Sequence, residues 1–507
     1  MTVRVIIFIA FLCTLTAPLI MRPQTRYQRS QHTLVILSPH TEEIRHEFSL
    51  AFNDWYQEKF GQTVECVWRN IGGTSEISRY IRSEFGAAFE NYWQAKHGRA
   101  IPISGWILPE RLDPEKRELA RQIKAELLDE GNGISIGVDL FYGGGEYDHD
   151  RCRRYGYSVP SRISAEILDG IPQQVAGIDF YHKDGYWYGT ALSSFGIVFN
   201  RHLHAMKSIN LPIPQSWTDL TDPRYRNLLA LADPRNSGAA TKGFEMILQS
   251  EMAKTTNLET GWRNGWQLIR RLSANARYFA SSSSKIPIDV AARNAAAGMV
   301  IDFYGRFQAQ YIGGDEVGYV NPIGGTVVSP DPISLMRGAP NREVSIRFVE
   351  FCLSEEGQKL WDLPVGYPGG PRQFVTRRSS IRPAIYEQFG EVLLNRDNPF
   401  TRAENGLRYR AEWTAPLFNL MRHLIGAMCI DTHSELKEAW DAVTAHPDEK
   451  VRLETFDALP ISHAEAIELV AEFSTPQQTM ERRHRWLMFF KNQYQRTVQP
   501  AGEITGI

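Results

Sequence analysis

The stretch that decides the fold runs from Val317 to Trp361 and reads VGYVNPIGGTVVSPDPISLMRGAPNREVSIRFVEFCLSEEGQKLW. Its first half consists of short apolar pieces separated by prolines and glycines, which predicts strands and turns rather than helix. Apolar side chains then recur at helical spacing and predict an amphipathic helix, at Val344, Phe348, Phe351 and Cys352. Ser354 is well placed to cap a second helix, because two glutamates follow it and suit the positive end of a helix dipole.

The chain before this stretch alternates between strand and helix patterns. Residues 34–37 predict a buried strand, residues 64–68 predict a second strand, and an amphipathic helix pattern follows each of them. Residues 86–133 look like an insertion, after which a strand is expected over 134–142. This order predicts a parallel sheet, and ligands bind such sheets at the carboxyl ends of the strands, where Gly143–Gly145 follow.

Composition excludes some classes of function. The chain has 507 residues, 43% of them hydrophobic, which is enough for two or three domains with cores of their own. Its net charge of -2 argues against a nucleic-acid partner. We find no Walker A, GxSxG or HExxH motif, and Asp148-His149-Asp150 is better interpreted as a polar loop than as a metal cluster. We therefore expect no catalytic residues and no metal cofactor.

The N-terminus has the pattern of an export segment. Arg4 precedes an apolar run from Val5 to Met21, which is either a signal peptide or an uncleaved membrane anchor. Either alternative places the rest of the chain outside the cytoplasm. Cys66 and Cys352 fall on apolar faces and are expected to be buried free thiols, whereas a disulfide between the other two cysteines, Cys152 and Cys429, stays open.

Three further segments carry a resemblance to a known family together with the Val317–Trp361 stretch. They read GYWYGTALSSFGIVFN at 185–200, WTDLTDPRYRN at 217–227 and ADPRNSG at 232–238. In this order they resemble the extracellular solute-binding proteins, family 1, of ABC importers, a family that includes the ferric-iron-binding proteins. The resemblance covers residues 30–375.

The resemblance implies an α/β, two-lobed periplasmic binding protein type II fold with a cleft between the lobes. Residues 33–199 and 320–375 would form lobe one, residues 200–319 lobe two, and residues 1–30 the signal peptide or membrane anchor. Residues 376–507 lie outside the resemblance and are predicted to be a C-terminal helical extension, because apolar side chains form a helical stripe at Trp413, Leu417, Leu420, Leu424 and Met428.

The resemblance also implies the function. The protein is expected to be a substrate-binding protein of an ABC transporter, and not an enzyme. It would capture a phosphorylated or phosphonate-like organic anion, or ferric iron, by closure about chain crossings near Ser193–Asn200 and Tyr319–Thr326. The expected partners are this ligand and a membrane permease, with no nucleic acid, for a monomer in the periplasm or another extracytoplasmic compartment. An extracytoplasmic hydrolase and a ligand-sensing receptor on the same fold remain alternatives.

Small and hydroxyl-bearing residues stand at three predicted helix starts, at 72–75, 236–241 and 281–284. Free backbone N–H groups and the helix dipole make such places suitable for anions. The resemblance places the first two of these loops at the cleft, together with the residues that follow several strands. The candidate ligand-binding residues are His40, Gly73, Thr74, Ser75, Gly144, Ser194, Ser237, Ala239, Thr241, Asp302 and Tyr304.

Two of these positions bear on the choice between ferric iron and an organic oxyanion. The ferric-binding relatives place a histidine at the position of His40, a glutamate after a later strand, and two adjacent tyrosines in lobe two. This chain has glycines at the glutamate position and Phe303-Tyr304 at the tyrosine pair. Since ferric iron prefers several anionic oxygen ligands, the sequence favours an oxyanion.

Overall fold

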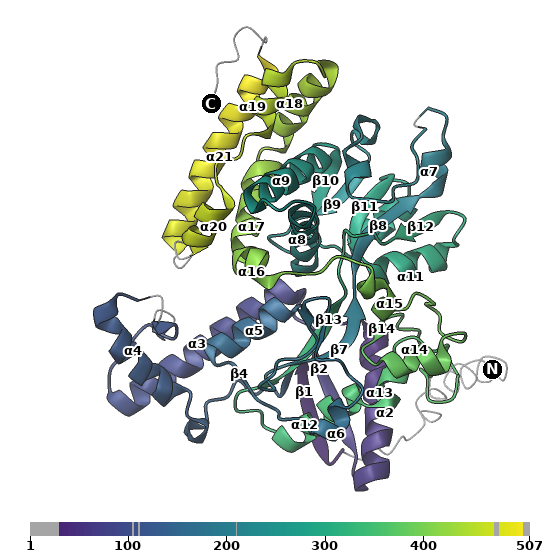
Figure 1. The fold of residues 1–507 in the computed structure, drawn as a ribbon. Coiled ribbons are helices and arrows are strands. Elements are labelled where there is room, and N and C mark those ends of the chain that lie inside the picture. Colours follow the sequence, from purple (N-terminus) through teal and green to yellow (C-terminus); the bar gives the residue numbers. More distant parts are fainter. Residues whose placement is uncertain (1–29, 104–105, 110–111, 209, 471–475, 500–507) are drawn as a thin grey trace, which may run out of the picture.

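The computed structural model describes residues 30–103, 106–109, 112–208, 210–470 and 476–499, which contain two large β-sheets (Figure 1). The first has the strand order β14-β7-β13-β3-β1-β2, with β4 beside β13. Its strands are β1 His32–Leu37, β2 Val64–Arg69, β3 Leu140–Tyr142, β4 Ser158–Val159, β7 Tyr188–Ser193, β13 Ser329–Met336 and β14 Ser379–Ser380. The second has the order β10-β9-β11-β8-β12. Its strands are β8 Phe195–Asn200, β9 Leu229–Ala232, β10 Ala276–Ala280, β11 Ala297–Ile301 and β12 Val317–Val320.

We call the first sheet with its helices lobe one. Its β1 pairs in parallel with β2 and β3, as the alternation of strand and helix predicted. The helices are α2 Glu42–Phe60, α3 Thr74–His97, α4 Pro114–Leu127, α5 Glu146–Tyr155, α6 Ala165–Leu168, α12 Arg342–Leu353, α13 Glu355–Lys359 and α14 Pro383–Phe389. A small hairpin of β5 Gln174–Val175 and β6 Ile178–Asp179 lies outside the sheet. Ser354 caps α13 as expected, because its hydroxyl accepts a hydrogen bond from the Gly357 amide.

The second sheet with its helices is lobe two. The helices are α7 Arg201–Ala205, α8 Gly238–Ala253, α9 Leu258–Ala274, α10 Lys285–Ala291 and α11 Asp302–Ile312. The chain passes from the first sheet to the second at Ser194, between β7 and β8, and returns between β12 and β13. These are the two places where the sequence predicted crossings.

The C-terminal segment is largely helical and packs against lobe two (Figure 1). It contains α15 Pro399–Glu404, α16 Ala411–Thr414, α17 Phe418–Ile425, a π-helical turn Gly426–Ile430, α18 His433–Ala445, α19 Lys450–Asp457, α20 His463–Leu469 and α21 Pro476–Val498. The predicted stripe from Trp413 to Met428 is buried in one apolar core with Phe244, Trp262 and Trp266 of lobe two. Before α16 the chain still belongs to lobe one, because Ala403, Leu407 and Tyr409 lie in the lobe-one core.

Several predicted boundaries differ from the structure. β8 belongs to the second sheet although 195–199 were predicted in lobe one, and β14 extends the first sheet within the predicted helical extension. The strand expected over 134–142 is only β3, because the Asp139 carboxylate, rather than a backbone carbonyl, accepts the Val35 amide hydrogen. The insertion expected from 86 begins with the continuation of α3 to His97. Residues 302–304 form the first turn of α11.

The cysteines of lobe one and of the C-terminal segment are not bonded to one another. Cys66, Cys152, Cys352 and Cys429 are all free thiols. Cys152 and Cys429 therefore do not form the disulfide that the sequence left open. Among the described residues, no helix combines the length and the apolar character needed to cross a membrane. The predicted export segment, Val5–Met21, lies outside the described residues.

Candidate functional site

A cavity of about 1520 Å³ is lined by residues of lobe one, lobe two and the C-terminal segment. Lobe one contributes the loops after β1, β2 and β3, while lobe two contributes the loops before α8 and α10 and the start of α11. The strand ends of both sheets therefore face one space, as expected for open α/β sheets. The C-terminal segment adds a third wall between Tyr409 and Leu420.

Among the helices of eight or more residues that begin at this cavity are three that start after a glycine or a serine. Gly73 precedes α3, Gly145 precedes α5, and Ser237 precedes α8; all three residues line the cavity. Ser237 is a true N-cap, because its hydroxyl accepts a hydrogen bond from the Ala240 amide at 3.1 Å. The first N–H groups of a helix have no partner within it and carry the positive end of the dipole, so each of these starts suits an anion.

The glycines at these starts are needed for close approach. Gly144 has φ of 103°, and a Cβ there would lie 2.6 Å from the Thr74 side chain. Gly143 has φ of 99° and lies against His40. Larger residues would push the start of α5 away from the start of α3, so the Gly143–Gly145 run lets the two helix starts share one corner of the cavity.

Asp331 organises the lobe-one wall of the cavity. Its carboxylate accepts hydrogen bonds from the Gly144 amide at 2.8 Å and from His40 Nε2 at 2.9 Å, and it pairs closely with Arg378. Burial and the neighbouring Arg378 hold the pKa of His40 well below its usual value, so this imidazole is neutral. Burial lowers the pKa of Arg378 to about 10, which leaves it charged at neutral pH. Its guanidinium lies 4.0 Å from the ring centre of Phe303.

A second ion cluster joins the two lobes. Lys242 of α8 contacts Glu146 of α5 at 2.9 Å and Glu245 of its own helix at 3.0 Å, and it lies 4.2 Å from the ring centre of Tyr409. Burial opposes the charge on Lys242, but the two carboxylates outweigh it and raise its pKa. The Tyr409 hydroxyl donates to Glu245 at 2.7 Å. Lys242, the basic group of this cluster, therefore has an acidic partner from each lobe.

Most of the predicted site residues line this cavity. They are His40, Gly73, Thr74, Gly144, Ser237, Ala239 and Tyr304. Their role in binding stays a prediction, since no ligand is present. The structure also places Asp331, Arg378 and Lys242 on the wall, which the sequence analysis did not single out. Asp331 had one signal, an ionisable residue inside an otherwise apolar strand pattern, whereas Arg378 and Lys242 had none.

The other four predicted residues lie behind the wall and do not line the cavity. Ser194 is at the first crossing, where its hydroxyl donates to Asp302 at 2.9 Å. Asp302 is buried beneath the start of α11, and burial raises the pKa of its carboxyl. Thr241 donates its hydroxyl to the Pro234 carbonyl at 2.9 Å, and Ser75 is buried in the first turn of α3. Each of the four is buried, although a sequence neighbour of each lines the cavity.

The donors at the cavity fit a ferric ion poorly. In the described part of the chain no three His, Cys, Asp or Glu side chains are grouped to hold a metal ion. Phe303 occupies the place of the second tyrosine, and burial raises the pKa of the Tyr304 phenol, which disfavours the phenolate that ferric iron requires. His149 of the polar Asp-His-Asp segment is buried, and burial lowers its pKa to about 3. It hydrogen-bonds to Ser334 and to the Gly143 carbonyl, so it holds the fold rather than a metal.

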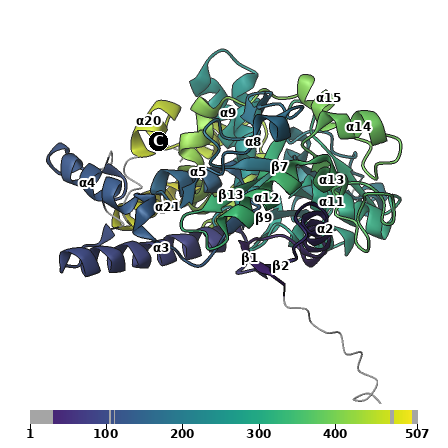
Figure 2. The same ribbon diagram turned by 90° about the horizontal axis from the view of Figure 1, so that it is seen from below.

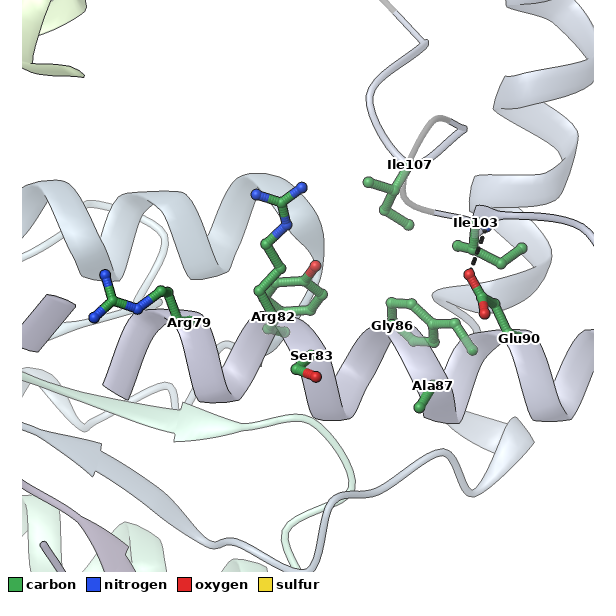
Figure 3. Close-up of a pocket in the computed structure, with 10 residues that line it drawn as sticks. Arg79, Arg82, Ser83, Gly86, Ala87, Glu90, Ile103 and Ile107 are labelled. Carbon is green, nitrogen blue, oxygen red and sulfur yellow. Dashed lines mark hydrogen bonds between the residues drawn. The ribbon is translucent and has the colours of Figure 1, made fainter. Parts of the chain in front are cut away.

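A smaller cavity of about 460 Å³ lies at the insertion (Figure 3). It is formed between α3 and the loop that carries Ile103 and Ile107, with Arg82 above it. Glu90 accepts a hydrogen bond from the Ile103 amide at 3.2 Å and fastens this loop to the helix. Seen from below, α3 and α4 extend away from the two sheets (Figure 2). None of the predicted site residues lies at this smaller cavity.

The two sheets with two crossings and a cavity between them define a two-lobed binding protein. Residues 138–378 match the family described as bacterial extracellular solute-binding protein.

Individual proteins are also similar to this chain. Iron-bound HitA from Pseudomonas aeruginosa is similar at a TM-score of 0.50 and 14% identity, over 78% of this chain and 99% of HitA. The periplasmic binding protein AfuA from Actinobacillus pleuropneumoniae, with fructose-6-phosphate bound, has a TM-score of 0.46 and 19% identity, over 65% of this chain and 82% of AfuA. An uncharacterized protein of Haemophilus influenzae is 26% identical over 151 residues, which are 29% of this chain and only 40% of that relative.

Proposed function

We propose that this protein is an extracytoplasmic substrate-binding protein of an ABC importer that captures a small organic oxyanion between its lobes. One observation carries the proposal: three helices from both lobes begin at a single cavity, α3 and α5 from lobe one and α8 from lobe two. Partial positive charge from both sides suits the oxygens of a phosphate or phosphonate group. A membrane permease that receives the ligand belongs to the same proposal.

Four acidic side chains on the wall do not oppose this function, because the structure gives them partners. Asp331 pairs with Arg378 and His40, and Glu146 pairs with Lys242. Asp150 pairs with Arg153 and Arg154. Glu245 accepts from Tyr409 and Thr414 and pairs with Lys242. With these four carboxylates paired, the helix starts remain available to an anion.

The volume of the cavity favours an organic ligand over a single ion. Pockets for drug-sized ligands typically enclose 300–1,000 Å³, and this cavity is larger, at about 1520 Å³. Aromatic rings also line it, with Tyr147 and Phe418 in contact at a centroid distance of 4.5 Å. We therefore expect the anionic group at the helix starts and a carbon-containing body against these rings.

The proposal is tested by asking what the protein carries. Protein made without residues 1–30 should be soluble and fold, and native mass spectrometry should detect a bound organic phosphate or phosphonate. Ser237→Asp keeps an N-cap for α8 but places a carboxylate at the site, so affinity should fall at least ~10-fold. Ser462→Asp, at the capping box of α20 and not at the cavity, is the matched control and should not change binding.

Tyr304→Phe should weaken oxyanion binding less than Ser237→Asp, because it removes one donor and adds no repulsion. The result that would overturn the oxyanion proposal is a coloured, iron-loaded protein whose colour is lost in Tyr304→Phe. Colourless protein whose co-purified organic anion dissociates in Ser237→Asp would support the proposal.

A further inference from the structure

Arg422 brings a buried positive charge to the start of α8 from the C-terminal segment, which lies outside the 138–378 family match. It is 9% exposed. Its Nε donates to the Thr241 hydroxyl at 3.0 Å, and its guanidinium lies 4.9 Å from the ring centre of Phe418. Its Nη2 is buried without a hydrogen-bond partner among the described residues, 3.6 Å from the point that a Cβ on Gly238 would occupy.

Asp148 faces the same point from the opposite lobe. Its Oδ2 lies 3.8 Å from the position of a Cβ on Gly238, and its other oxygen accepts from the Ser78 hydroxyl at 2.8 Å. Burial raises the pKa of this carboxyl although Arg422 pulls it down, so the attraction between the two groups does not offset the loss of water. The Arg422 guanidinium and the Asp148 carboxylate thus meet at Gly238, the first residue of α8, and neither charge is fully compensated.

An unsatisfied donor on a buried arginine is costly if the residue serves packing alone. A buried polar group without a partner destabilises the folded chain, and more so when it is charged. A methionine could fill the space beside Phe418 without that cost. The open Nη2 therefore indicates that the partner of Arg422 is absent from the unliganded chain, and the start of α8 is where that partner would sit.

We propose that Arg422 is a specificity-determining residue of this site, which selects a doubly charged oxyanion, of the phosphate monoester class, over a singly charged one. The inference rests on the proposed function and goes beyond it, because it assigns a ligand charge and a role for the C-terminal segment. The amides at the start of α8 compensate one negative charge, and the guanidinium compensates the second. Asp148 offsets Arg422 while the site is empty.

The test compares two small probes that differ in charge at pH 8, methyl phosphate as a dianion and dimethyl phosphate as a monoanion. Titrations followed by phosphorus NMR should show that the unmodified protein prefers methyl phosphate. Arg422→Gln should lose about 10-fold or more of the affinity for methyl phosphate and little for dimethyl phosphate, on the scale of a hydrogen bond to a charged group. Arg422→Lys keeps the charge and should retain most of the preference.

Two controls separate this inference from the proposed function and from folding. Arg410→Gln changes an exposed arginine of the same segment, over Trp413, and should leave both affinities unchanged. Asp148→Asn removes the facing carboxylate and should strengthen methyl phosphate binding several-fold, which tests the charge balance even if Arg422→Gln does not fold. An unchanged preference in Arg422→Gln, or unchanged binding in Asp148→Asn, overturns the role of Arg422. No binding of either phosphate to the unmodified protein overturns the proposed function itself.

Discussion

Asp331 is the residue on which the lobe-one wall of the cavity depends. It lies in β13 between Pro330 and Pro332, which cannot donate backbone hydrogen bonds, and its own side chain is buried. The carboxylate instead collects donors from three other parts of the chain, Gly144, His40 and Arg378. A buried carboxylate with this many partners is fixed in position. Removing one partner destabilises the folded state, because the charge then stays buried without full compensation.

Arg378→Met should therefore destabilise the protein by about 3–5 kcal/mol, because it leaves the Asp331 carboxylate buried without its cation. Urea unfolding measures this difference. In the double variant Arg378→Met with Asp331→Asn, the free energy of unfolding should fall by less than the sum of the losses in the two single variants, because the unpaired charge is gone. Strictly additive losses would show that the two side chains do not act as a pair.

At the scale of single residues, the sequence was informative only where local pattern sets the position. Ser237 and Gly73 were predicted because small and hydroxyl residues at a helix start leave a local signature. Arg378, Lys242 and Arg422 carried no such signature. The place of Arg378 and Lys242 at the cavity, and of Arg422 beside the start of α8, depends on how segments up to several hundred residues apart are packed.

At the scale of elements, α5 and α8 are the helices through which the lobes meet. Glu146 opens α5 and reaches Lys242, one turn into α8. The chain crosses between the two sheets at Ser194 and again between β12 and β13. Each lobe thus contributes one member of the Glu146–Lys242 ion pair at the cavity wall, and opening the cleft would separate these two side chains.

Glu146→Gln should make the unliganded protein adopt a more open average shape, because it removes the interlobe partner of Lys242 while Glu245 remains. Small-angle scattering should show a larger radius of gyration than for the unmodified protein, and saturating ligand should reduce it. Glu251→Gln, which removes an exposed pairing with Lys254 on the same helix, is the matched control. Superimposable scattering curves for the three proteins, with and without ligand, would contradict this role.

Elements bounded by proline, glycine or a capping residue were predicted well, and elements bounded by tertiary contacts were not. The α12–α13 pair followed from spacing and from Ser354. The length of β3 did not, because the Asp139 side chain, which also accepts from the Asn341 amide, replaces part of the strand ladder. The continuation of α3 to His97 depends on apolar contacts with the insertion, which periodicity alone does not delimit.

At the scale of the whole molecule, the C-terminal segment is a structural part of lobe two and also a wall of the cavity. The sequence placed it outside the family resemblance, and helical periodicity indicated its secondary structure but not its docking surface. The docking buries Trp413, Leu417 and Leu424 with Trp262 and Trp266. Loss of this segment should therefore unfold lobe two rather than release an independent domain.

The whole chain should lose stability as the pH falls below about 6.5. Burial lowers the pKa of His149 to about 3 and of His423 and His433 to about 4, and it also lowers that of His40. In the unfolded chain a histidine titrates near 6.5. Between the two values the unfolded state binds more protons, so each such histidine removes roughly 1.4 kcal/mol of stability per pH unit.

Buried carboxyls act in the opposite sense, because burial raises the pKa of Asp148, Asp302 and Asp362 and the folded state then gains protons as the pH falls. The buried histidines outnumber them, so urea midpoints measured at pH 7, 6 and 5 should decrease. His149→Gln should make that decrease shallower, because it removes one group that takes up a proton only on unfolding. The exposed His446→Gln should leave the slope as it is. Midpoints that stay level or rise toward pH 5 would show that the carboxyls dominate and that the buried histidines are not held neutral.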